Sequence, residues 1–289
     1  MTGIRTMLAV LSDPAGGASV LETAMAVARD QSCHVEALHV RPDPAQSVPL
    51  VGEAMSGAMV DEMMEVAERE GRDTAAKVRA LFDDFCGRYA IPTDVEPPGP
   101  PEVSASYKEL VGVEDTLVAC RGRVADMVVA ARPGSDDGSA LITLNAALME
   151  SGRPVLAAPA ETPESVGRRV AIAWNGSAEA ARAVSVALPI LTRAEAVVAL
   201  IADDTESERG IGAADLETHL AWHDVAVETR RILPVGAGAG PALLKGAQDA
   251  RADLLVMGAY THSRLRQLIL GGVTRHILAH APIPVLLSH

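Results

Sequence analysis

The order of buried strands and amphipathic helices occurs twice along this chain of 289 residues, and this repeat constrains the fold more than any other feature. Apolar runs at residues 8–11 and 170–174 open the two copies, and a helical pattern follows each run. Near the end of each copy, residues 126–129 correspond to residues 253–256. Self-similarity of this kind indicates a duplicated structural unit.

Each copy alternates between apolar runs of strand length and longer segments with helical periodicity. In the first copy we expect strands at 7–11, 35–40, 93–96, 106–110, 127–131 and 155–158, and helices at 17–29, 59–89, 115–123 and 139–150. In the second copy we expect strands at 170–174, 197–201, 226–231, 254–257 and 285–287, and helices at 178–191, 211–222, 241–250 and from about 273 to 281.

This alternation predicts an α/β fold, in which a parallel sheet is covered by helices on both faces and the crossovers are right-handed. The chain length favours two domains of roughly 140 residues each. A polar, proline-containing segment at 160–165 separates the copies. We therefore expect two Rossmann-like, doubly wound domains in tandem, at residues 1–160 and 167–289.

Composition excludes several classes of function. Apolar residues make up 48% of the chain, which is ample for two cores, but aromatic residues make up only 2%, so stacking platforms for nucleic acid are not expected. The formal charge of −13 would repel a phosphate backbone. We find no apolar stretch of about 18 residues and no secretory pattern, and we expect no membrane partner and a cytoplasmic location.

The three cysteines, Cys33, Cys86 and Cys120, are widely spaced and form no Cys-x-x-Cys pair. This spacing favours reduced, mostly buried thiols over a metal or redox site.

The last part of the chain carries the pattern that most strongly indicates a ligand. Gly258 ends a buried apolar run, and the pair Gly271 and Gly272 opens a helical segment. A helix that begins at glycines leaves free backbone N–H groups at the positive end of its dipole. This arrangement suits a phosphate group.

The same stretch resembles the nucleotide-binding signature of the universal stress protein (UspA-type) family. The family pattern is Gly, two residues, Gly, nine residues, Gly, and then Ser or Thr. Gly258 and Gly271 stand at the first and third glycine positions with the family's spacing, Thr261 stands at the second, and Gly272 stands at the Ser/Thr position. The resemblance to a tandem protein of this family, with adenine-nucleotide-hydrolase-like domains, covers nearly the whole chain.

The resemblance implies an adenine nucleotide, ATP or AMP, in the second domain only. The positions that would bind it are Asn175, Ala202, Gly258, Thr261, His262, Gly271, Gly272, Val273 and Thr274. It also implies that the last strands of the two copies, 155–158 and 285–288, pair to form an intramolecular pseudo-dimer, and it leaves a further homodimer open.

Charge distribution separates the two copies. Residues 253–289 contain three arginines, four histidines and one acidic residue, which favours an anionic ligand, although arginines on a solvated loop and glycines in tight turns would give the same pattern. In the first copy, Asp136 and Asp137 precede the corresponding helix and would repel a phosphate. We therefore expect the first copy to have lost the nucleotide and to serve as a scaffold or interaction surface.

The motifs for catalysis are incomplete. His276 and His280 have the spacing of a zinc pair, but the metalloprotease glutamate is missing, so structural or solvent-facing histidines are favoured. No Gly-x-Ser-x-Gly elbow follows a strand. We expect a non-catalytic stress-response protein. The alternatives are a ligand-free adaptor or scaffold, and a slow ATPase in the second copy.

Overall fold

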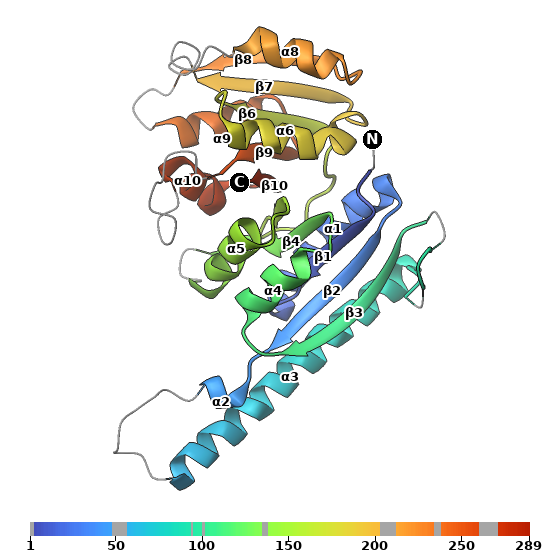
Figure 1. Ribbon diagram of the computed structural model, residues 1–289, viewed down its shortest axis with the longest axis vertical. Helices are drawn as coiled ribbons and strands as arrows, with labels where there is room; N and C mark the ends of the chain where they lie inside the picture. Colours follow the sequence, from blue (N-terminus) through green and yellow to red (C-terminus); the bar gives the residue numbers. More distant parts are fainter. Residues whose placement is uncertain are drawn as a thin grey trace.

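A computed structural model of the chain describes residues 3–47, 57–93, 95–99, 102–134, 138–202, 212–233, 238–259 and 271–289. Strands and helices alternate along it (Figure 1). The first half contains β1 (Thr6–Val10), α1 (Pro14–Gln31), β2 (His34–Arg41), α2 (Pro44–Ser47), α3 (Gly57–Tyr89), β3 (Ser104–Val111), α4 (Glu114–Gly122), β4 (Met127–Ala131), α5 (Gly138–Glu150) and β5 (Val155–Ala158). The second half contains β6 (Arg169–Trp174), α6 (Ala178–Leu191), β7 (Ala196–Ala202), α8 (Ala213–Ala221), β8 (Val227–Ile232), α9 (Ala239–Asp249), β9 (Leu254–Gly258), α10 (Gly272–His280) and β10 (Val285–Ser288).

The strands form one sheet in the order β3-β2-β1-β4-β5-β10-β9-β6-β7-β8. Within each half all the pairings are parallel. The order in the first half, read from the edge of the sheet, is repeated in the second half, where β6 takes the place of β1 and β10 the place of β5. The predicted α/β class and the predicted repeat are confirmed.

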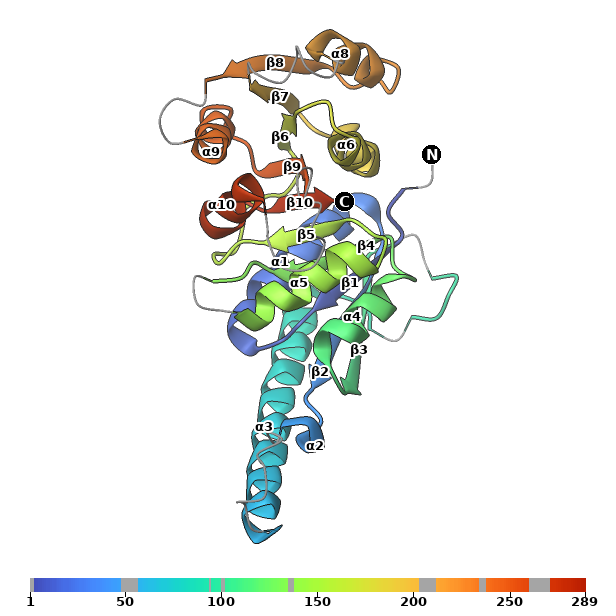
Figure 2. The same cartoon turned by 60° about the vertical axis from the view of Figure 1, so that its left-hand side comes forward.

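Helices cover both faces of the sheet, and each layer crosses from one half to the other (Figure 2). Residues of α1, α3, α6 and α8 pack in one core cluster, and residues of α4, α5, α9 and α10 pack in another. The central strands are buried on both faces, which explains why they read as continuous apolar runs in the sequence.

The halves meet at β5 and β10, which pair antiparallel with Leu156 opposite Leu286. The family resemblance implies this strand pairing, and the register confirms it. A hydrogen bond also joins the halves beside the strands: Gln31 Nε2 donates to the carbonyl oxygen of Pro189 at 2.9 Å. Within the first half, the Ser19 hydroxyl donates to the carbonyl oxygen of Pro159 at 2.7 Å, just after β5. Because Gln31 belongs to α1 and Pro189 to α6, the contact between the halves extends beyond the two strands.

An aspartate just before the fourth strand of each half fixes the start of the first strand. The carboxylate of Asp126 accepts hydrogen bonds from the backbone N–H groups of Arg5 and Thr6. Asp253, at the corresponding place, accepts from the N–H groups of Gly167 and Arg169. The repeat therefore extends from the strand order to individual hydrogen bonds.

One expected strand is wrong. Residues 93–96 were expected to be extended and paired, but the described residues among them, Thr93, Val95 and Glu96, belong to no strand. Thr93 and Glu96 are exposed, so this segment has no apolar face to bury against the sheet. The third strand of the half is β3 instead, which confirms and extends the expected strand at 106–110.

The long helix α3 projects beyond the sheet at its amino end (Figure 1). Its buried residues, Ala75, Val78, Phe82, Phe85 and Cys86, all lie in its carboxyl half. Within the described residues, no helix combines the length and the apolar character that crossing a membrane requires.

The pairing of the halves can be tested by truncating its central side chains. Leu156 and Leu286 are fully buried, so Leu156→Ala and Leu286→Ala should each lower the free energy of unfolding by about 2–5 kcal/mol. Leu233, which is 65% exposed, provides the control, and Leu233→Ala should change stability by less than about 0.5 kcal/mol. Urea titration followed by circular dichroism measures all three. Equal stabilities for the variants and the control would contradict the observed register.

The thiols provide a second test of packing. Burial raises the pKa of Cys33 to about 12 and that of Cys86 to about 11, whereas Cys120 is exposed. Because the thiolate is the reacting species, only Cys120 should react rapidly with Ellman's reagent at about pH 8 in the native protein. After denaturation all three cysteines should react. Rapid reaction of two thiols in the native state would show that one of the helices covering them opens readily.

Candidate functional site

The candidate residues of the second half lie at the carboxyl edge of its strands. In the register of the sheet Ala173 is opposite Met257, and Trp174 is opposite Ile201. Asn175 directly follows Trp174, Gly258 directly follows Met257, and Ala202 directly follows Ile201. The fold therefore brings all three to the same edge. Ligands of doubly wound sheets bind outside this edge.

Asn175 shapes the turn between β6 and α6. Its Oδ1 accepts a hydrogen bond from the backbone N–H of Ser177 at 3.1 Å, and the Ser177 hydroxyl accepts one from Ala180 N–H, which caps the helix. At the corresponding place in the first half, Asp13 caps α1 by accepting from the N–H groups of Ala15 and Gly16. Both side chains therefore have a structural role that needs no ligand.

Gly258 is required by packing. A Cβ at this position would lie 2.5 Å from the backbone nitrogen of Ala180 and 2.7 Å from the Cβ of Glu179. The first turn of α6 therefore passes directly over the end of β9. The sequence pattern assigns Gly258 to a ligand site, but the structure shows that the contact between α6 and β9 needs a glycine at this position.

Gly271 and Gly272 have open surroundings. A Cβ built at either position meets nothing in the described residues within 4 Å. Gly271 is the N-cap of α10, and within the described residues no side-chain cap hydrogen bond is formed there. Within this first turn Val273 is half-buried and Thr274 is buried, while Arg275 is exposed. The amino end of α10 can therefore accept an anion.

Two predicted ligand residues, Thr261 and His262, lie outside the described residues, as do Arg264 and Arg266. Ala202 is described as the last residue of β7. The structure thus brings together Asn175, Ala202 and Gly258, and shows an open amino end at Gly271–Thr274.

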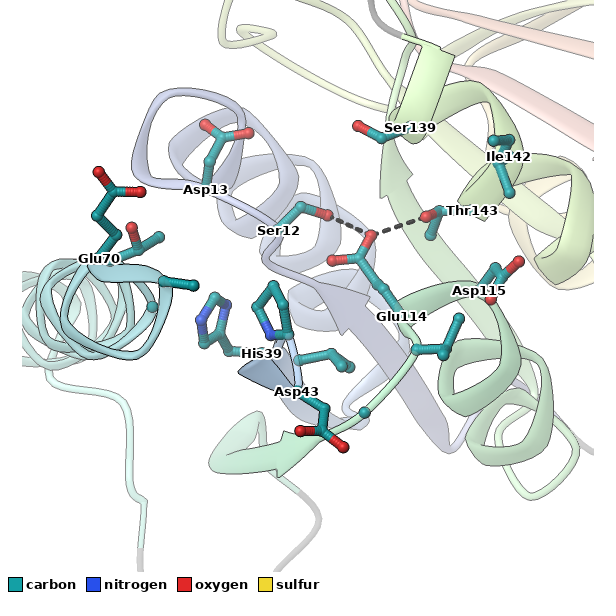
Figure 3. Close-up of a pocket in the computed structure, with 17 residues that line it drawn as sticks. Ser12, Asp13, His39, Asp43, Glu70, Glu114, Asp115, Ser139, Ile142 and Thr143 are labelled. Carbon is teal, nitrogen blue, oxygen red and sulfur yellow. Dashed lines mark hydrogen bonds between the residues drawn. The ribbon is translucent and has the colours of Figure 1, made fainter. Parts of the chain in front are cut away.

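The first half has a cavity of about 810 Å³ at the corresponding edge of its sheet, which the sequence analysis missed (Figure 3). It lies among the segments that follow β1, β2 and β3, with α3 and α5 as further walls. Its lining residues are Ser12, Asp13, His39, Val40, Pro42, Asp43, Ala67, Glu70, Gly71, Thr74, Gly112, Val113, Glu114, Asp115, Ser139, Ile142 and Thr143. These residues come from five separate segments, so no single motif marks the cavity.

Glu114 lies at the centre of this cavity's hydrogen bonding (Figure 3). Its Oε1 accepts from the Ser12 hydroxyl at 2.8 Å and from the Thr143 hydroxyl at 2.7 Å. Ser12 follows β1 and Thr143 belongs to α5, so the carboxylate joins three elements. Two hydroxyl donors that would suit a phosphate are already bound to a protein carboxylate.

His39 is a buried polar residue of the cavity wall, with 2% of its surface exposed. Its Nδ1 lies 2.7 Å from the carbonyl oxygen of Leu11. Because a carbonyl can only accept, Nδ1 carries a proton, and Nε2 is the acceptor in the neutral ring. Nε2 is buried and has no hydrogen-bond partner in the described chain.

A second cavity, of about 490 Å³, lies between the halves. Gly134 and Leu141 line it from the first half, and Arg275, His276 and His280 line it from α10. The rings of His276 and His280 stack with their centroids 4.3 Å apart. In the described part of the chain, no group of three or more His, Cys, Asp or Glu is placed to hold a metal ion.

Comparison with known proteins identifies a family for the second half. The model of the universal stress protein family matches residues 167–289. Universal stress protein Slr1230 of Synechocystis sp. is 36% identical over 83 residues, which are 29% of this chain and 27% of that protein. A universal stress protein of Mycolicibacterium smegmatis is 38% identical over 72 residues, 25% of this chain and 54% of that protein. The matches thus span about a quarter and about a half of these relatives.

A solved structure extends the likeness to both halves at the level of fold. The crystal structure of a universal stress protein from Archaeoglobus fulgidus has a TM-score of 0.63 and covers 98% of this chain and 97% of its own. The two sequences are 17% identical, so this likeness shows a shared Rossmann-like architecture alone.

The packing at Gly258 can be tested by adding one methyl group. Because the new Cβ would contact backbone atoms of α6, Gly258→Ala should lower the free energy of unfolding by about 1–3 kcal/mol. Gly271→Ala is the matched control, since the space around it is open, and it should change stability by less than about 1 kcal/mol. Thermal or urea unfolding measures both. If Gly258→Ala is as stable as the control, the glycine is not required for packing.

Proposed function

We propose that this chain is a tandem universal stress protein with domains at residues 1–160 and 167–289, of which the second binds an adenine nucleotide, ATP or AMP. The match of the family model to residues 167–289 carries this proposal. The repeated strand order supports a second domain of the same type in the first half.

The chemistry of the site supports a phosphate-containing ligand. In the part of the chain that the structure describes, no side-chain cap hydrogen bond forms at the start of α10, and the positive end of the helix dipole favours an anion there. Arg275 is exposed in the first turn and adds positive charge. Asn175, Ala202 and Gly258 lie at the carboxyl edge, where the adenosine would bind. Thr261 and His262 belong to the proposed site through the family resemblance.

We assign no catalytic residue and propose a binding role in the stress response, located in the cytoplasm. The antiparallel pairing of β5 with β10 supports an intramolecular pseudo-dimer in which both protomer-like halves belong to one chain. A further homodimer would use other surfaces, because both of these strands already have partners on each side.

Bound nucleotide can be detected directly. Denaturing the purified protein and separating the supernatant by anion exchange should release ATP or AMP. If the protein is empty as purified, ATP·Mg at about 100 times its Kd should stabilise it by roughly 2.7 kcal/mol, seen as a higher melting temperature. No released nucleotide together with no shift would favour a ligand-free adaptor. ATP turnover above that of the Gly272→Glu variant would favour the slow ATPase.

The substitution Gly272→Glu tests the site at α10. A glutamate in the first turn suits the helix dipole, so the fold should persist, while its charge repels a phosphate and the thermal shift should disappear. The matched control is Gly138→Glu, the same change at the glycine that begins α5, which is also in open space. The control should retain the full shift. A shift lost only in Gly138→Glu would place the nucleotide in the first half instead.

A further inference from the structure

The cavity of the first half is strongly acidic. Five carboxylates line it, Asp13, Asp43, Glu70, Glu114 and Asp115, and within the described chain no lysine or arginine does. The remaining wall consists mainly of small polar and apolar side chains. A concave site lined by one sign of charge concentrates ligands of the opposite sign, so this cavity attracts cations and repels nucleotides.

Several of these carboxylates can still accept hydrogen bonds. In the described chain Glu70, Glu114 and Asp115 form no ion pair with an arginine or lysine. Glu114 uses Oε1 for its two hydroxyl partners and has a second oxygen available. An ionised carboxylate offers about four acceptor sites, so each of these groups has capacity for a donor from a ligand.

His39 provides an independent indication of a ligand. Its ring is buried in the cavity wall, and its acceptor Nε2 has no donor in the described chain. A buried polar atom without a partner is costly, and such an atom at a site indicates a missing partner. In the neutral ring this atom accepts, so the group that satisfies it is a hydrogen-bond donor, as it is for the carboxylates.

A bare metal ion fits this site poorly. No group of three or more His, Cys, Asp or Glu in the described chain is arranged to hold one, and about 810 Å³ is the size of an organic ligand's pocket. The carboxylates also lie on different sides of the cavity, Glu70 on the α3 side and Glu114 and Asp115 on the α4 side (Figure 3). A ligand with a single charge would leave one side unpaired.

We propose that this cavity binds an aliphatic polyamine, a flexible chain that carries two or more ammonium groups. The ammonium groups donate to the carboxylates on the two sides, and one N–H reaches the Nε2 of His39. The methylene segments between the ammonium groups pack against apolar side chains such as Val113 and Ile142. This proposal concerns the first half and does not depend on nucleotide binding in the second.

Isothermal titration of the full-length protein with spermidine, at about 150 mM salt to screen the general surface charge, tests the proposal. We expect one saturable site per chain. Glu114→Gln, which keeps an oxygen for Ser12 and Thr143, should weaken binding about tenfold or more. His39→Asn, which keeps an N–H donor for the Leu11 carbonyl oxygen but has no atom at the position of Nε2, should weaken it by a similar factor.

Two further variants keep the outcome decisive. Glu70 lies on an exposed helix surface, so folding does not depend on its charge. Glu70→Gln should weaken spermidine binding by about threefold. Glu161→Gln removes the same charge from an exposed residue of the connecting segment and should change the affinity by less than about twofold. Gly272→Glu should leave spermidine binding unchanged even though it abolishes nucleotide binding, so the two proposals can fail separately.

Three results would overturn the proposal. The first is the absence of a saturable site in the unmodified protein. The second is equal weakening by Glu161→Gln and Glu114→Gln, which would show general attraction to an acidic protein of net charge −13. The third is full displacement of spermidine by Mg²⁺ at the same ionic strength, which would show that the cavity gathers counter-ions without recognising an amine.

Discussion

The antiparallel pairing of β5 with β10 is the interaction on which the arrangement of the whole molecule depends. Without it, each half would expose a largely apolar strand at the edge of its sheet, and such a strand can pair with another chain. With it, the backbone groups of both strands are satisfied and one sheet runs through the molecule. The pairing also places Leu156 and Leu286 in the same core cluster as helices from both halves, so the two cores are continuous across it. One chain thereby supplies an interface that two separate chains would otherwise have to form.

Because this framework satisfies its own hydrogen bonds, the edge at which ligands bind is free to differ between the halves. Asp126 and Asp253 fix the strand starts at the opposite edge in the same way in both halves. At the carboxyl edge, the first half has carboxylates around a cavity, and the second half has glycines that open a helix. The side chains in these places contribute little to the cores, so exchanging them alters the ligand chemistry at small cost to stability. The repeat therefore determines the fold of both halves without determining what each of them binds.

The sequence predicted the architecture well, because parallel strands that are buried on both faces appear in the sequence as continuous apolar runs. The bounds of β4, β5 and α6 were expected at the residues where they occur. The expected strand at 93–96 was wrong because extended residues alone do not form a strand when no apolar face pairs with the sheet. The cavity of the first half could not be predicted, since His39, Glu70 and Glu114 are far apart in the sequence and only the packing of α3 and α4 around the sheet brings them together. Glycine motifs also proved ambiguous: the open surroundings of Gly272 suit a ligand, whereas Gly258 is required by the contact with α6.

Electrostatics explains why the nucleotide that we propose for the second half would not be bound by the same chemistry in the first half. A phosphate at α10 would gain from the first N–H groups of the helix and from the charge of Arg275, and these gains do not require a hydroxyl at position 272. At the corresponding edge of the first half, the hydroxyls of Ser12 and Thr143 already donate to Glu114, and the neighbouring carboxylates repel any second anion. Placing a nucleotide there would require removing Glu114 and neutralising several acids together. Single substitutions would leave the electrostatic potential of the cavity negative, so a cationic ligand is the chemistry that is compatible with it.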